Sequence, residues 1–376
     1  MGSIREKLSD LTSIGIADVS AKGVSAIFWF YIASTLGPEG YGQITYFLSV
    51  AMIASTVSLL GAANTLVVYT AKNVRIQPAI YVLTLISGTV TSIVVFFIFF
   101  NVGASSLILG YVIFILVTSE LLGQKIYKNY SKFVITQRVL MVILGLGMFY
   151  LLGEDGILLG IAISYLVYVF GIARGFKKYK IDFRLIKDRF NFIINSYLQT
   201  LAATLNGSLD KLIILPLFGY ALLGNYSLGL QFLTVLQILP VIVSKYIISQ
   251  DSSGIENKKL KKIAILVSIG LATIGLSVGP IAVSVIFPKF IEADEVIRIV
   301  SISLVPGTIG LMYHSKFLGQ EKSRKVLISS MIWVGTQILG IIVLGTIYGI
   351  NGIAASLVLG ATASAIYVVL ADKFEK

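Results

Sequence analysis

The chain of 376 residues is 56% hydrophobic and only 13% charged, and its mean hydropathy of +0.91 excludes a water-soluble globular protein. It has a formal net charge of +12, one histidine and no cysteine, which excludes disulfides and thiolate metal sites and argues against a bound transition metal. We therefore expect an all-α membrane protein that needs no cofactor.

Uncharged apolar stretches, each about one bilayer long, predict about twelve transmembrane helices. Residues 1–19 are charged and mildly amphipathic, and we expect a cytoplasmic interfacial helix there rather than a signal peptide. An N-terminal six-helix bundle is expected at 20–173, a basic cytoplasmic linker at 174–190, a C-terminal six-helix bundle at 191–371 and a cytoplasmic tail at 372–376. The predicted spans are 20–36, 43–70, 78–100, 104–123, 133–152, 156–173, 191–218, 221–248, 263–287, 293–317, 326–348 and 351–371.

The segments between the predicted spans alternate in charge. Of the 30 Lys and Arg residues, 27 lie in or beside the terminal segments and every second loop, while the opposite loops hold acids such as Glu39, Glu154 and Asp294. Because basic residues collect on the cytoplasmic side, we expect a multi-pass protein of the cytoplasmic membrane with both termini inside. Topology and anionic lipid headgroups account for the net charge, so membrane lipids are expected partners and nucleic acid is not.

The predicted span 191–218 carries a polar face. Asp210 and Lys211 lie near its mid-depth, where one charge costs about 2.5–3.5 kcal/mol in an apolar helix, so neither is expected to face lipid. We expect this face to line a wet cavity, with Gln199 and Asn206 contacting a substrate. The alternative is that the face packs against a neighbouring helix and that Asp210 pairs internally. The polar residues recur at helical spacing: Asn191, Asn195, Gln199, Asn206 and Asp210.

Four other charges lie within or beside predicted spans. Arg298 either reaches the outer surface or pairs with Asp294, four residues before it. Glu120 ends a span, where a solvated helix end is the simpler interpretation. Lys22 and Arg138 either line a cytoplasmic vestibule or meet lipid phosphates.

Motifs of known catalytic sites are absent from the sequence. It has no Gly-rich phosphate loop, no HExxH, no nucleophile elbow and no long external loop that bears carboxylates. We therefore expect that the protein is not an enzyme.

A faint internal repeat relates the two halves. The stretch Glu39–Val50 aligns without gaps on Gly224–Val235, so that Tyr41 falls on Tyr226. Since each half contains an even number of spans, the halves are expected to be parallel repeats.

Three short motifs also carry a family resemblance. They are Leu36-Gly-Pro-Glu-Gly-Tyr-Gly42 after the aromatic Phe28-Trp-Phe-Tyr31, Ser208-Leu-Asp-Lys211 followed by Leu223-Gly-Asn-Tyr226, and the basic turn Lys316–Lys325 that contains Gly319. In their order, and in twelve spans divided by a basic loop, the sequence resembles the polysaccharide-biosynthesis flippases. These are the O-antigen (Wzx-like) branch of the multidrug/oligosaccharidyl-lipid/polysaccharide (MOP) exporter superfamily. The resemblance covers essentially the whole chain.

The resemblance implies a V-shaped pair of six-helix bundles around a central cavity. It implies that the protein flips a polyprenyl-diphosphate-linked oligosaccharide from the cytoplasmic to the outer leaflet by alternating access, for polysaccharide or glycoconjugate biosynthesis. A diphosphate headgroup needs cations, and the candidates are Lys211, Arg298, Lys22 and Arg138. The candidates for coupling to protons or sodium are Asp210 and Glu120. A glycan polymerase or glycosyltransferases are candidate protein partners.

Three other functions stay open on the sequence. A multidrug cation antiporter of the same superfamily predicts an acidic cavity. A membrane glycosyltransferase or polymerase predicts catalytic acids on a long external loop. A scaffold for a glycan assembly complex predicts that neutral substitutions at Asp210 and Lys211 have no effect.

Overall fold

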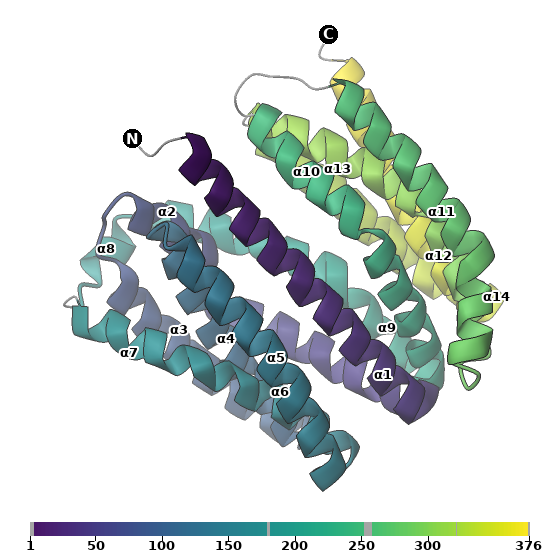
Figure 1. Ribbon diagram of the computed structural model, residues 1–376, viewed down its shortest axis with the longest axis horizontal. Coiled ribbons are helices and arrows are strands. Elements are labelled where there is room, and N and C mark those ends of the chain that lie inside the picture. Colours follow the sequence, from purple (N-terminus) through teal and green to yellow (C-terminus); the bar gives the residue numbers. More distant parts are fainter. Residues whose placement is uncertain (1–3, 179–180, 252–257, 321, 375–376) are drawn as a thin grey trace. The chain divides into compact units, whose positions relative to one another are not determined.

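The structure is a computed structural model that describes residues 4–178, 181–251, 258–320 and 322–374, and all regular structure in these residues is helical (Figure 1). The helices are α1 (Ile4–Leu59), α2 (Ala62–Ala71), α3 (Gln77–Phe99), α4 (Val102–Gly123), α5 (Tyr127–Leu152), α6 (Glu154–Ser164), the 3₁₀ turn η1 (Tyr165–Tyr168), α7 (Val169–Lys178), α8 (Arg184–Lys187), α9 (Phe190–Leu236), α10 (Ile238–Asp251), α11 (Lys258–Ile286), α12 (Ala293–Ile302), α13 (Leu304–Gly319) and α14 (Ser323–Lys373).

Three of these helices are each long enough to cross a bilayer twice. The apolar part of α1 has 40 residues, α9 has 47 and α14 has 51, whereas about 20 residues span the hydrocarbon core. Each contains one glycine at positive φ, which breaks the helix into two: Gly37, Gly219 and Gly349. These breaks lie where the sequence predicts short loops between spans. Together with the other apolar helices, they confirm the expected all-α membrane architecture of about twelve spans.

Two predicted elements differ in detail. The interfacial helix expected at 1–19 stays a prediction, and its described part, residues 4–19, continues into the first span because α1 runs from Ile4 to its break at Gly37. The tenth span is bent by 41° between α12 and α13, three residues before Pro306. Proline lacks the backbone N–H that would continue the helical ladder there.

The chain packs into two compact units whose boundaries differ from the predicted bundles. The first unit contains the described part of Met1–Phe28 together with Phe47–Thr204, and the second contains Trp29–Tyr46 with the described part of Leu205–Lys376. The bundle expected at 20–173 therefore gives up one segment to the second unit. The first fifteen residues of α9 pack with the first unit, although the sequence analysis placed them in the second bundle.

In the first unit, α4 lies at the centre and packs against α2, α3 and α6, while α5 packs along α6 (Figure 1). Small residues allow these helices to approach closely. A side chain at Gly110 would meet the Tyr165 ring at 2.7 Å, and one at Gly160 would overlap the Leu144 carbonyl. Membrane helices commonly use small residues in this way, because van der Waals packing drives their association.

In the second unit, the corner that the break at Gly37 makes in α1 packs on the corner that the break at Gly219 makes in α9. A side chain at Gly42 would overlap the Tyr220 carbonyl, and one at Gly224 would overlap the Pro38 carbonyl, so the contact is reciprocal. Equivalent residues of the two corners, such as Gly42 and Gly224, are 182 positions apart in the sequence, and so are Gly37 and Gly219. The predicted repeat register of 185, with Tyr41 on Tyr226, is therefore wrong by three residues.

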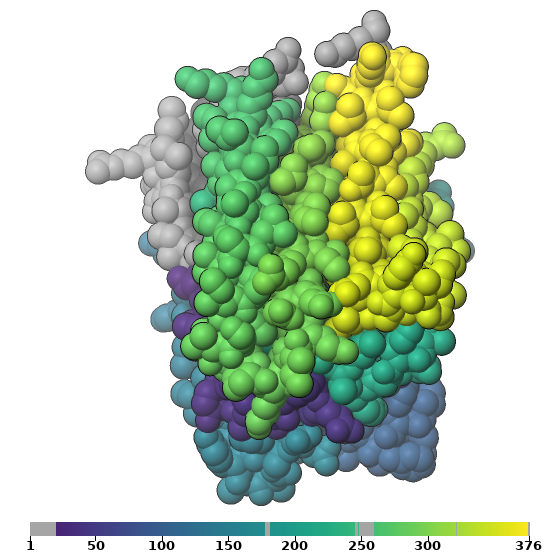
Figure 2. Space-filling view, turned by 90° about the vertical axis from the view of Figure 1, so that its right-hand side faces the viewer, coloured from purple at the N-terminus to yellow at the C-terminus, as the bar shows by residue number. Residues whose placement is uncertain are grey.

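The outer faces of both units are apolar. Val90, Ile93 and Phe97 stand exposed on α3, and Leu266 and Val285 stand exposed on α11. Figure 2 shows α11, in green, running along one such face of the second unit. Such long apolar surfaces are stable against lipid hydrocarbon rather than water.

Candidate functional site

A buried charge cluster in the second unit is centred on Asp210. Only 5% of this side chain is exposed, and its Oδ1 lies 3.2 Å from the Lys211 ammonium. The Tyr226 hydroxyl donates to Oδ2 over 3.0 Å. The carboxylate therefore has a cation and a phenol as partners, in agreement with the alternative that Asp210 pairs internally.

The cluster continues from α9 to α14. The Gln337 amide donates to the Tyr226 oxygen over 3.4 Å, and the Trp333 indole donates to the Gln337 oxygen over 3.1 Å. The Lys211 ammonium also donates to the Gly207 carbonyl over 3.2 Å. An ammonium has three N–H donors, and these contacts with Asp210 and Gly207 use two of them.

Asn206 lies one turn before Asp210 on α9. Its Oδ1 is buried and has no hydrogen-bond partner among the described residues. A buried acceptor without a donor is costly in a low-dielectric environment. Its expected role in substrate binding stays a prediction.

A second buried acid, Glu120 on α4, lies in the first unit and is 8% exposed. The Tyr81 hydroxyl donates to its Oε2, and the Gln124 amide donates to Oε1 over 2.6 Å. Glu120 is thus not the solvated helix end of the simpler interpretation. It also lines a cavity of about 210 Å³ with Asn129 and with Arg174 from the predicted basic linker.

A cavity of about 400 Å³ separates α2 from α9 in the first unit. Its polar lining consists of Asn64, Asn195, Ser196 and Gln199, and Phe192 contributes an aromatic ring. The first half of the predicted polar face therefore does border open space. This agrees with the expected cavity-lining role of Gln199 in position, and contact with a substrate stays a prediction.

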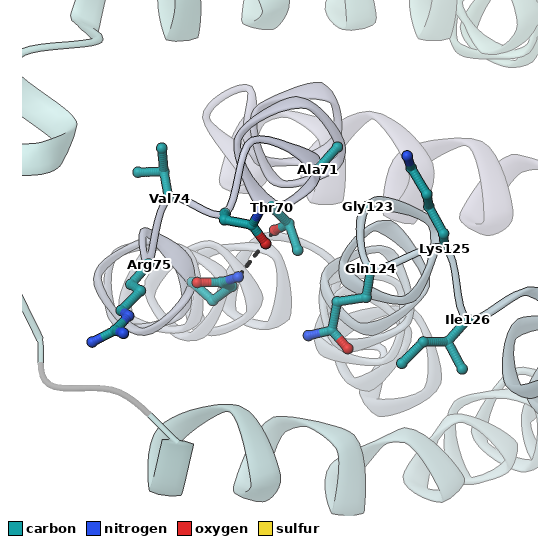
Figure 3. A pocket seen from close by; sticks show the side chains of 10 residues that line it. Thr70, Ala71, Val74, Arg75, Gly123, Gln124, Lys125 and Ile126 are labelled. Carbon is teal, nitrogen blue, oxygen red and sulfur yellow. Dashed lines mark hydrogen bonds between the residues drawn. The ribbon is translucent and has the colours of Figure 1, made fainter. Parts of the chain in front are cut away.

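A larger cavity of about 530 Å³ lies at the turns that follow α2 and α4 (Figure 3). The Gln77 amide donates to the Thr70 hydroxyl over 3.1 Å, while the other amide atom, Oε1, is buried without a partner among the described residues. Arg75 and Lys125 lie on opposite sides of this cavity, and Figure 3 shows their charged ends turned away from each other. The cations therefore do not converge on one point.

The other predicted cations do not join the acid clusters. Arg298 is exposed on α12 and makes no ion pair with Asp294 within the described part of the chain. Arg138 is half-buried, and its Nη1 lies 3.6 Å from the Met141 sulfur, while its Nε lacks a described partner. Lys22 is exposed on α1. Among the described residues, no three His, Asp or Glu side chains are placed to hold a metal ion.

Sequence reasoning missed the uncharged donors to both acids, which are Tyr226 for Asp210 and Tyr81 and Gln124 for Glu120. Only Gln124 had a usable signal, because it follows Glu120 by four residues, directly after the end of α4. Tyr226 and Tyr81 occupy positions that look like ordinary apolar core positions in the sequence, and only their hydroxyl groups set them apart.

No protein-family profile and no curated protein sequence matches this chain. Solved structures do. The inward closed conformation of the lipid II flippase MurJ superposes with a TM-score of 0.73 at 14% identity, over 96% of this chain and 87% of that one. The inward-facing conformation of a multidrug resistance MATE family transporter gives a TM-score of 0.67 at 16% identity, over 95% and 94%.

The chain has the fold of the MOP-superfamily transporters. A further MOP-superfamily transporter, from Pyrococcus furiosus and described as having a binding pocket of reverse polarity, gives a TM-score of 0.68 at 15% identity, over 97% and 95%. At these low identities, the superpositions show the shared fold and nothing further.

Proposed function

We propose that the protein is a flippase for a polyprenyl-diphosphate-linked oligosaccharide in the cytoplasmic membrane. In this proposal, both termini lie in the cytoplasm and the headgroup passes from the cytoplasmic to the outer leaflet by alternating access. The products serve polysaccharide or glycoconjugate biosynthesis, with a glycan polymerase or glycosyltransferases as working partners.

The observation that carries the proposal is the state of the two acids within the predicted spans. Asp210 is buried against Lys211 and Tyr226, and Glu120 is buried against two hydrogen-bond donors, Tyr81 and Gln124. A transporter of organic cations needs an acid that is open to its substrate, because burial of an unpaired cation is costly. This arrangement favours a neutral or anionic headgroup.

The second candidate is a multidrug cation antiporter, because a MATE family transporter has the same fold. In that case Asp210 or Glu120 would exchange its present partners for a proton, a sodium ion or the drug. The same two acids are our candidates for ion coupling in the flippase.

The test is translocation of a labelled polyprenyl-diphosphate oligosaccharide in proteoliposomes. Wild type is compared with Asp210→Asn, Lys211→Ala and the double variant Asp210→Asn/Lys211→Gln, which removes both charges and keeps polar groups at both positions. We expect wild type to flip the lipid and both single variants to lose flipping while they stay folded and inserted.

The opposite outcome is equally specific. Wild type that flips none of several glycans, but that drives ion-coupled efflux of an organic cation, would replace the flippase with the antiporter. Full flipping by all three variants would exclude the Asp210 cluster from transport.

A further inference from the structure

The cavity between α2 and α9 has an unusual lining for a membrane protein. Asn64, Asn195 and Gln199 present three carboxamides to it, all three exposed, and no acidic or basic side chain lines it. None of the three amides has a hydrogen-bond partner among the described residues. Each offers both N–H donors and a carbonyl acceptor, which is the combination that a hydroxyl group satisfies.

The size and the remaining lining also suit a small polar ligand. The volume of about 400 Å³ is within the usual range of small-molecule sites. Phe192 adds an apolar ring beside the amides, as the C–H face of a sugar ring requires. An organic cation finds no counter-charge here, and a bare phosphate finds no cation.

Two cations lie just beyond one end of this cavity, on a shared ring. Tyr69 of α2 meets Phe192 edge to face at 5.2 Å. The guanidinium of Arg189 lies 5.0 Å from the Tyr69 ring centre, and the ammonium of Lys72 lies 5.8 Å from it. Both cations lie against the same ring, so an anion that reaches this end of the cavity is attracted by two positive charges.

The order of these groups along the chain follows a regular line. On α9, Phe192, Asn195 and Gln199 follow one another at steps of three or four residues and so lie on one helical face, and Arg189 stands in the turn directly before the helix. The line reads cation, ring, amide, amide. A glycosyl phosphate has the matching order of anion and then hydroxyl-bearing ring.

We propose that the α2–α9 cavity binds the first sugar of a phosphate-linked glycan, with Lys72 and Arg189 holding the phosphate at its end. The proposal rests on the flippase function and assigns the headgroup to a place within the first unit. Arg189 is suited to this role, because its fork of N–H donors matches phosphate oxygens. Within the described part of the chain, one of these groups, Nη1, donates to the Leu185 carbonyl over 2.9 Å and the others have no acceptor.

Binding to the protein in nanodiscs tests the proposal with two probes that differ only in the sugar. The probes are farnesyl diphosphate and farnesyl-diphosphate-linked N-acetylglucosamine. Asn195→Leu/Gln199→Leu should weaken the sugar-bearing probe about tenfold, as expected for two lost hydrogen bonds, and leave farnesyl diphosphate unchanged. Lys72→Gln/Arg189→Gln should weaken both probes. Matched controls, Gln320→Leu and Lys187→Gln on exposed positions, should change neither.

Three results would overturn the proposal, given variants with wild-type size-exclusion profiles. If the amide variant binds each probe as tightly as wild type does, the sugar site is excluded. Flipping by wild type would then still leave the proposed function intact. A cation variant that loses only its response to phosphatidylglycerol in the disc would assign Lys72 and Arg189 to a lipid headgroup. Wild type that neither binds nor flips any diphosphate-linked lipid would remove the proposed function and this site together.

Discussion

The hydroxyl oxygens of Thr45 and Ser227 lie 3.1 Å apart, although 182 residues separate them in the chain. The same separation relates Gly42 to Gly224, each of which lies against a backbone carbonyl of the other corner. Two broken helices of the second unit are thus joined by reciprocal backbone contacts and, one turn later, by a hydroxyl pair.

Replacing either corner glycine should destabilise the second unit. A methyl group at Gly224 would overlap a backbone carbonyl, which cannot move as a side chain can, so Gly224→Ala should cost at least about 1–3 kcal/mol. Thermal unfolding in detergent measures this cost. Gly270→Ala is the control, because nothing lies within 4 Å of a side chain there and the substitution should be neutral or slightly stabilising. Equal melting temperatures for Gly224→Ala and Gly270→Ala would contradict the corner contact.

The hydroxyl pair should show energetic coupling. In a double-mutant cycle of Thr45→Val and Ser227→Ala, we expect a coupling energy of about 0.5–1.5 kcal/mol in favour of the pair. Unfolding of the two single variants and the double variant provides the value. Strict additivity would mean that the hydroxyl groups do not bond across the corner.

Removing one charge of the Asp210–Lys211 pair should destabilise the protein more than removing both. Lys211→Ala leaves a buried carboxylate without its cation, so we expect a loss of about 3–5 kcal/mol, as for other broken buried pairs. Asp210→Asn/Lys211→Gln should be closer to wild type in stability, because no unpaired charge remains. Chemical unfolding or thermal inactivation separates them. A double variant less stable than Lys211→Ala would contradict this, because it would show that the cost comes from loss of the ion pair itself and not from an unpaired buried charge.

The Glu120 cluster gives a matched pair of tyrosine variants. Tyr81→Phe removes a donor from a buried carboxylate and should cost about 1–3 kcal/mol. Tyr348→Phe removes the same atom from a side chain that is 65% exposed, and it should change little. The comparison is made by thermal unfolding of both variants in one detergent. A cost for Tyr81→Phe no greater than for Tyr348→Phe would argue against a stabilising Tyr81–Glu120 bond.

The helical architecture was largely predictable, because it follows from local properties. Apolar length sets each span, and a glycine marks the break in each of the three longest helices, at Gly37, Gly219 and Gly349. The packing of Trp29–Tyr46 with the second unit was not predictable, because hydropathy carries no information on which helices touch.

The charged residues of the candidate site were predictable, and the hydroxyl and amide groups that bind them were not. Asp210 stands out because a carboxylate is rare within an apolar span. Tyr226, which donates to it, follows 16 residues later beyond the break at Gly219, and the sequence does not specify how that corner folds. The repeat register failed for a related reason, since apolar segments align nearly as well when shifted by one helical turn.

The composition of the second unit also constrains how the protein is made. More than 150 residues separate Trp29–Tyr46 from Leu205, where the rest of that unit begins. At about 5–20 residues per second, Trp29–Tyr46 waits roughly 10–30 seconds after its own synthesis before the rest of the second unit begins to be made. The amino-terminal half is therefore not an independent folding unit. If the chain is expressed as two pieces divided at the basic linker, the carboxyl-terminal piece remains incomplete until the first piece supplies Trp29–Tyr46.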